Sequence, residues 1–137
     1  MKKTNRQIQD ELIKQYRITI EPNSKCYGRT HVHIKKRTIC KWKQTNSVVS
    51  TFTLLHEIGH CENNNSKMRR CEEEYNATQW ALDKCAELNI DVPVKIIQKY
   101  QRYIYNELAR GLRRNGSGYP SKEEMQLRYK MPTRTLL

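Results

Sequence analysis

The sequence predicts an α+β fold, in which a small antiparallel sheet of two or three strands packs on a central helix with further helices behind it. Two observations lead to this class. Long segments carry apolar residues at helical spacing, whereas short segments near the N-terminus alternate between apolar and polar residues. With 137 residues and 36% hydrophobic content, the chain is expected to form one domain with a modest core.

The N-terminal third is expected to hold one helix and all of the strands. Ile8 and Leu12 lie one helical turn apart, and Thr4 or Asn5 precedes them as a suitable N-cap. The alternating segment that follows is ended by Pro22, which is typical of a strand limit. The expected elements are a helix at 4–16, a strand at 17–21 and two strands within 26–43.

The remainder of the chain is expected to be helical. Periodic apolar residues predict helices at 48–61, 71–88 and 94–114, the last opened by Pro93. The stripe that we expect the last helix to bury comprises Ile97, Tyr100, Ile104, Leu108 and Leu112. We assign residues 1–120 to a single domain and residues 121–137 to a polar C-terminal tail that we expect to be partly disordered.

The net charge of +12 is unevenly distributed. Residues 1–46 carry +9 and residues 93–137 carry +7, whereas residues 47–92 carry −4. Buried metal ligands and a catalytic base would account for part of the acidic excess in the middle. The basic flanks fit either a solvated surface or a surface that faces nucleic acid or an acidic protein.

Neither a membrane span nor a secretory leader is expected. No apolar run approaches eighteen residues, and the first twelve residues, MKKTNRQIQDEL, contain no apolar stretch of the signal-peptide kind. We therefore expect a cytoplasmic protein. Its five cysteines form no C-x-x-C pair, so we expect reduced thiols packed as small hydrophobic groups: Cys26, Cys40, Cys61, Cys71 and Cys85.

The segment TLLHEIGH at residues 53–60 contains an H-E-x-x-H motif within a predicted helix. His56 and His60 are four residues apart and therefore lie on one helical face, where both rings can reach one ion. Glu57 lies about 100° round the helix, beside that face, so its carboxylate can reach a water molecule on the metal. This arrangement predicts a zinc ion held by two histidines and a general base at Glu57. The alternative is a core helix that carries two histidines.

Gly59 is an unfavourable residue within this helix, costing roughly 1 kcal/mol relative to alanine. A close approach by another backbone would explain its presence.

Zinc also needs a third protein ligand, and no histidine follows His60. A downstream carboxylate is the natural choice, as in sites with two histidines and one glutamate. Glu62 is too close in sequence to turn back easily. Three glutamates open the next predicted helix, and helix packing alone does not choose among them: Glu72, Glu73 and Glu74.

Two segments together resemble the ImmA/IrrE family of zinc metallopeptidases. These are TLLHEIGH at 53–60 and EYNATQWA at 74–81, which is similar to that family's E-x-x-A-(D/N)-x-(F/W)-A pattern. The resemblance implies that Glu74 is the third zinc ligand. Thr78 stands where the family usually has Asp or Asn to support a ligand histidine, and this departure weakens the expected support of the site.

The resemblance covers about residues 51–81 and also suggests a biological setting. Many members of the family are encoded near repressors of mobile elements, and some cleave them. It therefore implies a protein substrate of that kind, such as a DNA-binding repressor, in the bacterial cytoplasm or a phage-infected host.

His31 and His33 lie two residues apart, on one face of a predicted strand. One interpretation is functional: the pair acts as a transition-state donor, a substrate contact or an extra metal ligand. The other is that the two histidines form an exposed pair on an edge strand. Residues 29–41 could pair with an extended substrate by strand addition. Their many basic residues equally fit protection of an edge against aggregation.

A binding module is the alternative function. In this interpretation, a catalytically weak or inactive zinc fold contacts nucleic acid or a partner protein through its basic flanks. Aromatic and basic residues intermingle in the last predicted helix, a pattern that suits base stacking and phosphate contacts but is also common on half-buried helices.

Overall fold

The computed structural model describes residues 2–21, 29–64, 68–114 and 123. The elements run in the order α1 (Asn5–Gln15), β1 (Thr19–Glu21), β2 (His31–His33), β3 (Thr38–Cys40), α2 (Val48–Glu62), α3 (Arg70–Glu87) and α4 (Val94–Arg114). The predicted α+β class is confirmed. The predicted boundary near residue 120 and the tail at 121–137, apart from Glu123, lie outside the described residues, as does Cys26.

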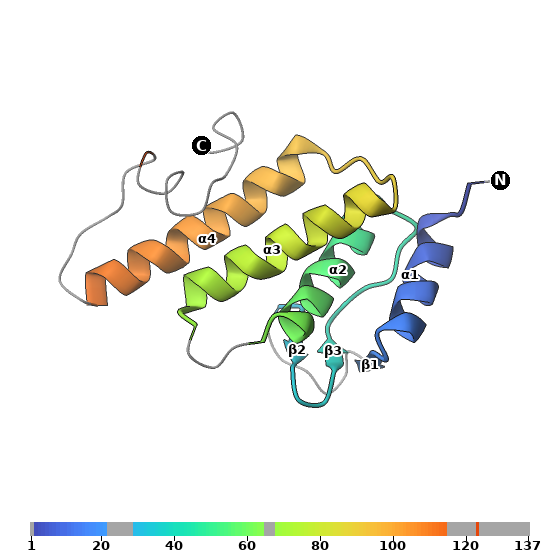
Figure 1. Ribbon diagram of the computed structural model, residues 1–137, viewed down its shortest axis with the longest axis horizontal. Coiled ribbons are helices and arrows are strands. Elements are labelled where there is room, and N and C mark those ends of the chain that lie inside the picture. The colour runs from blue at the N-terminus through green and yellow to red at the C-terminus, as the bar shows by residue number, and fades with distance from the viewer. Residues whose placement is uncertain (1, 22–28, 65–67, 115–122, 124–137) are drawn as a thin grey trace.

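Each helix packs against the next one in the sequence: α1 against α2, α2 against α3 and α3 against α4. Figure 1 shows α2, α3 and α4 side by side, with the strands near one end of α2 and α1 on the side away from α4. The side chains that α2 buries lie on nearly all of its faces rather than on one stripe, because α1, the sheet and α3 surround it. Its four fully buried apolar side chains are Phe52, Leu54, Leu55 and Ile58.

Side-chain caps begin the first two helices. Thr4 accepts a hydrogen bond from the Gln7 backbone, and the Gln7 side chain accepts one from the Thr4 backbone, which forms a capping box. Ser47 caps α2 by accepting a hydrogen bond from the Ser50 backbone. This cap fixes where α2 begins.

The sheet is mixed, with strand order β1-β3-β2. β2 pairs with β3 in antiparallel fashion as expected, but β1 runs parallel to β3, so the expectation of a wholly antiparallel sheet is wrong. The β2–β3 hairpin supplies the reversal that brings β3 alongside β1. β2 is consequently an edge strand, and it contacts α2.

Two apolar clusters hold the helices together. The larger joins α1, the sheet, α2, α3 and Ile96 in the first turn of α4. The smaller joins Cys71 of α3 to Ile104 and Leu108 of α4. The buried face of α4 is rotated from the predicted stripe, because Ile97, Tyr100 and Leu112 are only half-buried. The residues that α4 buries fully are Ile96, Gln101, Ile104, Leu108 and Ala109.

The described thiols follow the expectation for packed cysteines. Cys40, Cys71 and Cys85 are buried and Cys61 is half-buried. Burial raises the pKa of the Cys85 thiol to about 11, so this side chain stays protonated in the core at neutral pH. Among the described residues, no helix combines the length and the apolar character needed to cross a membrane.

Candidate metal centre

α2 presents both histidines of the HEIGH segment to α3. His56 and His60 are one helical turn apart, and their ring centroids are 4.7 Å from each other. The side chains of His56 and Glu57 are almost completely buried, and His60 is slightly more open. Both rings therefore have little contact with solvent.

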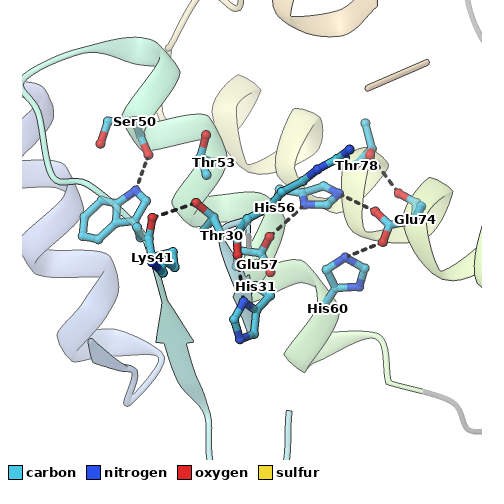
Figure 2. Close-up of polar contacts among 12 residues, drawn as sticks. Thr30, His31, Lys41, Ser50, Thr53, His56, Glu57, His60, Glu74 and Thr78 are labelled. Carbon is cyan, nitrogen blue, oxygen red and sulfur yellow. Dashed lines mark hydrogen bonds and ion pairs between the residues drawn. The ribbon is translucent and has the colours of Figure 1, made fainter. Parts of the chain in front are cut away.

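Glu74 of α3 reaches both histidines. Its Oε2 atom lies 3.2 Å from His56 Nε2 and its Oε1 atom lies 3.3 Å from His60 Nε2. Figure 2 draws both contacts as dashed lines. Two of the other glutamates considered as ligands form ion pairs with arginines. Glu62 pairs with Arg37, and Glu73 pairs with Arg70 at 4.0 Å.

The close approach of α3 to α2 explains Gly59. A Cβ atom at this position would lie 2.8 Å from the backbone oxygen of Ala77 and 3.1 Å from its Cα. The expectation that another backbone approaches Gly59 is thus confirmed. Since Ala77 lies one turn after Glu74, this contact brings the Glu74 carboxylate within reach of the histidine rings.

Contacts within this group shift the pKa values of Glu74 and His56. Burial opposes the charged form of Glu74, but its contacts with His56 and His60 outweigh burial and hold the pKa of Glu74 well below its usual range. Burial likewise favours neutral His56, but Glu57 and Glu74 prevail and raise the pKa of His56. The pocket therefore favours a positive charge between the carboxylates.

Two buried atoms of this group lack a hydrogen-bond partner within the described part of the chain. They are His56 Nε2 and Glu74 Oε2, which approach each other closely without the alignment of a hydrogen bond. Buried polar atoms are rarely left unsatisfied, so each such pair needs an explanation. A metal ion coordinated by both atoms would satisfy them.

The donor set also fits a metal ion. The ligating atoms of His56, Glu57 and His60 lie within 4.8 Å of one another, an arrangement compatible with metal binding. Glu57 Oε1 lies 3.6 Å from His56 Nδ1, on the other side of the ring from Nε2. Glu57 therefore contacts the ring nitrogen of His56 that Glu74 does not contact.

A cleft of about 470 Å³ opens onto these residues. It is lined by residues from the β2 region and from α2, α3 and α4. Val32 of the edge strand β2 is among them, so the strand expected to pair with an extended substrate does border the site. Three cations also reach the cleft from different elements: Arg29, Arg70 and Lys99.

Tyr100 is a cleft residue whose place the sequence does not reveal. Its ring centroid lies 4.6 Å from that of His56 and 5.0 Å from that of Phe52. Burial raises the pKa of Tyr100 to about 12, although a hydrogen bond with Thr53 opposes the shift. The hydroxyl consequently stays protonated at neutral pH. The sequence predicts only that Tyr100 belongs to an apolar stripe.

Arg70 is another cleft residue that the sequence does not indicate, because a cation in the first turn of a helix carries no functional signal of its own. Its guanidinium lies 3.3 Å from Glu74 Oε1, although its side chain is mostly exposed. It also hydrogen-bonds Tyr103, which lies under Arg29 at 5.7 Å from the guanidinium carbon to the ring centroid. Arg70 thus helps to fix the orientation of the Glu74 carboxylate.

The remaining residues singled out in the sequence have distinct positions. Thr78 is buried, and its hydroxyl donates a hydrogen bond to the backbone oxygen of Glu74, 2.8 Å away and in the same helix (Figure 2). His31 is half-buried and lines the cleft, whereas His33 is exposed and is not among the lining residues. Their ring centroids are 5.3 Å apart.

No protein-family model, curated protein sequence or solved structure matches the chain.

Proposed function

We propose that the protein is a zinc metallopeptidase that cleaves a protein substrate. The observation that carries this proposal is the convergence of His56, His60 and Glu74, with two of their buried atoms left without a hydrogen bond. Two imidazoles and a carboxylate with one open position are the donor set of catalytic zinc sites. The motif resemblance to ImmA/IrrE metallopeptidases leads to the same function.

The chain's own residues would divide the reaction among them. A zinc ion held by His56, His60 and Glu74 would supply an electrophile and acidify water. The Glu57 carboxylate accepts the proton of the attacking water and returns it to the leaving amine. Tyr100 keeps its hydroxyl proton at neutral pH and can donate a hydrogen bond to the negative charge that develops on the substrate oxygen.

The cleft favours an extended polypeptide as the substrate. β2 is an edge strand, so one of its sides offers backbone groups to an added strand. Such pairing is independent of side-chain identity, and the cleft walls would select the residues near the scissile bond. A DNA-binding repressor of a mobile element is the substrate class that the resemblance suggests.

The test is a comparison of wild type with Glu57→Gln and His60→Ala on a library of internally quenched fluorescent peptides. We expect about one zinc per chain in wild type and Glu57→Gln, with cleavage by wild type only. Loss of a general base should slow cleavage by roughly 10²–10⁴-fold. Equal cleavage by Glu57→Gln would refute the mechanism. Zinc binding without cleavage of any peptide above the His60→Ala background would refute the peptidase function.

The exposed charge of α4 favours a second candidate function, which is binding of nucleic acid. Six of its cations are exposed: Lys95, Lys99, Arg102, Arg110, Arg113 and Arg114. Binding through phosphates would weaken steeply with salt and would be unaffected by Glu57→Gln. Absence of binding to duplex or single-stranded DNA at low salt would exclude this candidate.

A further inference from the structure

A second cluster of metal-ligating side chains lies on the sheet. It consists of His31, His33 and Cys40. Each residue offers one possible ligand atom, a ring nitrogen or the cysteine sulfur, and the three atoms lie within 4.8 Å of one another. The cluster belongs to β2 and β3, whereas the first site belongs to α2 and α3. The peptidase proposal assigns no role to Cys40.

The strand register assembles this cluster. His31 is the direct cross-strand partner of Cys40, and His33 lies two residues further along the same strand. Side chains two apart on a strand share a face, as do direct partners on neighbouring strands. Val32 and Ile39 occupy the opposite face and pack into the main apolar cluster. The two histidines and the cysteine therefore project from the sheet face opposite to Val32 and Ile39.

One hydrogen bond prepares His31 as a ligand. Its Nδ1 atom lies 2.7 Å from the backbone oxygen of Arg29. A carbonyl oxygen can only accept, so Nδ1 carries the proton and Nε2 of the neutral ring keeps its lone pair. Metal-binding histidines are commonly oriented in this way, by donation from the second ring nitrogen to a backbone carbonyl.

The chemistry of the donors selects the class of metal. A thiolate and two imidazoles suit zinc and similar transition metals, whereas magnesium and calcium prefer oxygen ligands. Cys40 is only 2% exposed, but His33 is exposed, so an ion has an entry path from solvent on the His33 side.

We propose that His31, His33 and Cys40 bind a second transition-metal ion of the zinc class. Binding requires the thiol to lose its proton to solvent, after which sulfur and two ring nitrogens coordinate the ion. The ion would join β2 to β3 and so fix the edge strand that borders the cleft. The proposal does not depend on peptidase activity.

Cobalt(II) distinguishes the two sites, because thiolate ligation produces a sulfur-to-cobalt charge-transfer band in the near ultraviolet and ligation by histidine and glutamate does not. Full-length protein is stripped with a chelator and titrated with cobalt(II), and bound metal is counted by mass spectrometry. We expect about two ions per chain and the thiolate band in wild type. In His60→Ala, which removes a ligand of the first site, the band should remain.

Two variants target the second site. Cys40→Ser should abolish the band, and His33→Ala should weaken cobalt binding at this site by at least about 10-fold. His33 is exposed, so His33→Ala is expected to fold even if the buried Cys40→Ser does not. Cys61→Ser is the matched control, since Cys61 follows His60, and it should keep the band.

The outcomes separate the two proposals. Absence of the thiolate band in wild type, or a band that persists in both His33→Ala and folded Cys40→Ser, would overturn the second site. A band that disappears in Cys61→Ser instead would assign the sulfur to the first site and would also overturn it. None of these results bears on whether the protein cleaves peptides.

Discussion

Replacing Gly59 by alanine tests the contact that brings α3 to α2. A helical Gly→Ala change normally stabilises a helix by up to about 1 kcal/mol. Here the added methyl group would lie 2.8 Å from the Ala77 backbone oxygen, a separation that real Cβ atoms essentially never show. Neither helix backbone can rotate away as a side chain could, so α2 and α3 must separate by a few tenths of an ångström. Overpacking of this kind costs about 1–3 kcal/mol.

The two effects have opposite signs, and the steric cost is the larger. We therefore expect Gly59→Ala to lower the free energy of unfolding by up to about 2 kcal/mol. Separation of the helices also moves Glu74 away from His60, so zinc affinity should fall as well. The free energy is measured by urea unfolding of metal-free protein followed by circular dichroism, and zinc affinity by competition with a chromophoric chelator.

Gly111→Ala is the matched control. Gly111 lies within α4, where a Cβ atom would meet no atom within 4 Å outside its own helix and immediate neighbours. This substitution should therefore stabilise the protein by up to about 1 kcal/mol and leave zinc affinity unchanged. If Gly59→Ala were as stabilising as Gly111→Ala and kept full zinc affinity, the inferred contact between α2 and α3 would be wrong.

Three further predictions concern the site. Glu74→Gln keeps the side-chain shape but removes the charge that faces both histidines. Zinc affinity, measured by chelator competition, should therefore fall. The loss should exceed the roughly 10–100-fold that is typical of residues that only support a ligand. The pKa of His56 is raised in metal-free protein while Glu74 stays ionised, so zinc must displace a proton from His56. Zinc affinity should therefore rise with pH until His56 is neutral. Below that pH, calorimetry in buffers of different ionisation enthalpy should detect the release of this proton. Tyr100→Phe keeps the ring against His56 but removes the hydroxyl, so zinc content should be unchanged while kcat falls by roughly 10²-fold; an unchanged kcat would exclude Tyr100 as a donor.

Local sequence patterns predicted most of the secondary structure. The helix predicted at 94–114 has those bounds, and Thr4, one of the two predicted N-cap candidates, caps α1. These features depend on residues close in sequence, so they can be recognised without tertiary information. The parallel pairing of β1 with β3 could not, since it joins segments separated by the whole of β2.

For the candidate metal centre, the sequence by itself determined two things. The four-residue spacing of His56 and His60 places both on one helical face, and the position of Glu57 places its carboxylate beside that face. Both follow from the regular geometry of a single helix. Gly59 also indicated that another backbone would approach, because glycine is otherwise unfavourable there.

Only the tertiary structure shows which of the three neighbouring glutamates faces the histidines. Glu72, Glu73 and Glu74 differ by about 100° each in direction around α3, and the rotation of α3 at the Gly59–Ala77 contact turns Glu74 toward the histidines. The position of Tyr100 against His56 and of Cys40 beside His31 likewise depends on how distant segments pack. Helix rotation and strand register are set by contacts across the whole core, and for this reason no local pattern contains them.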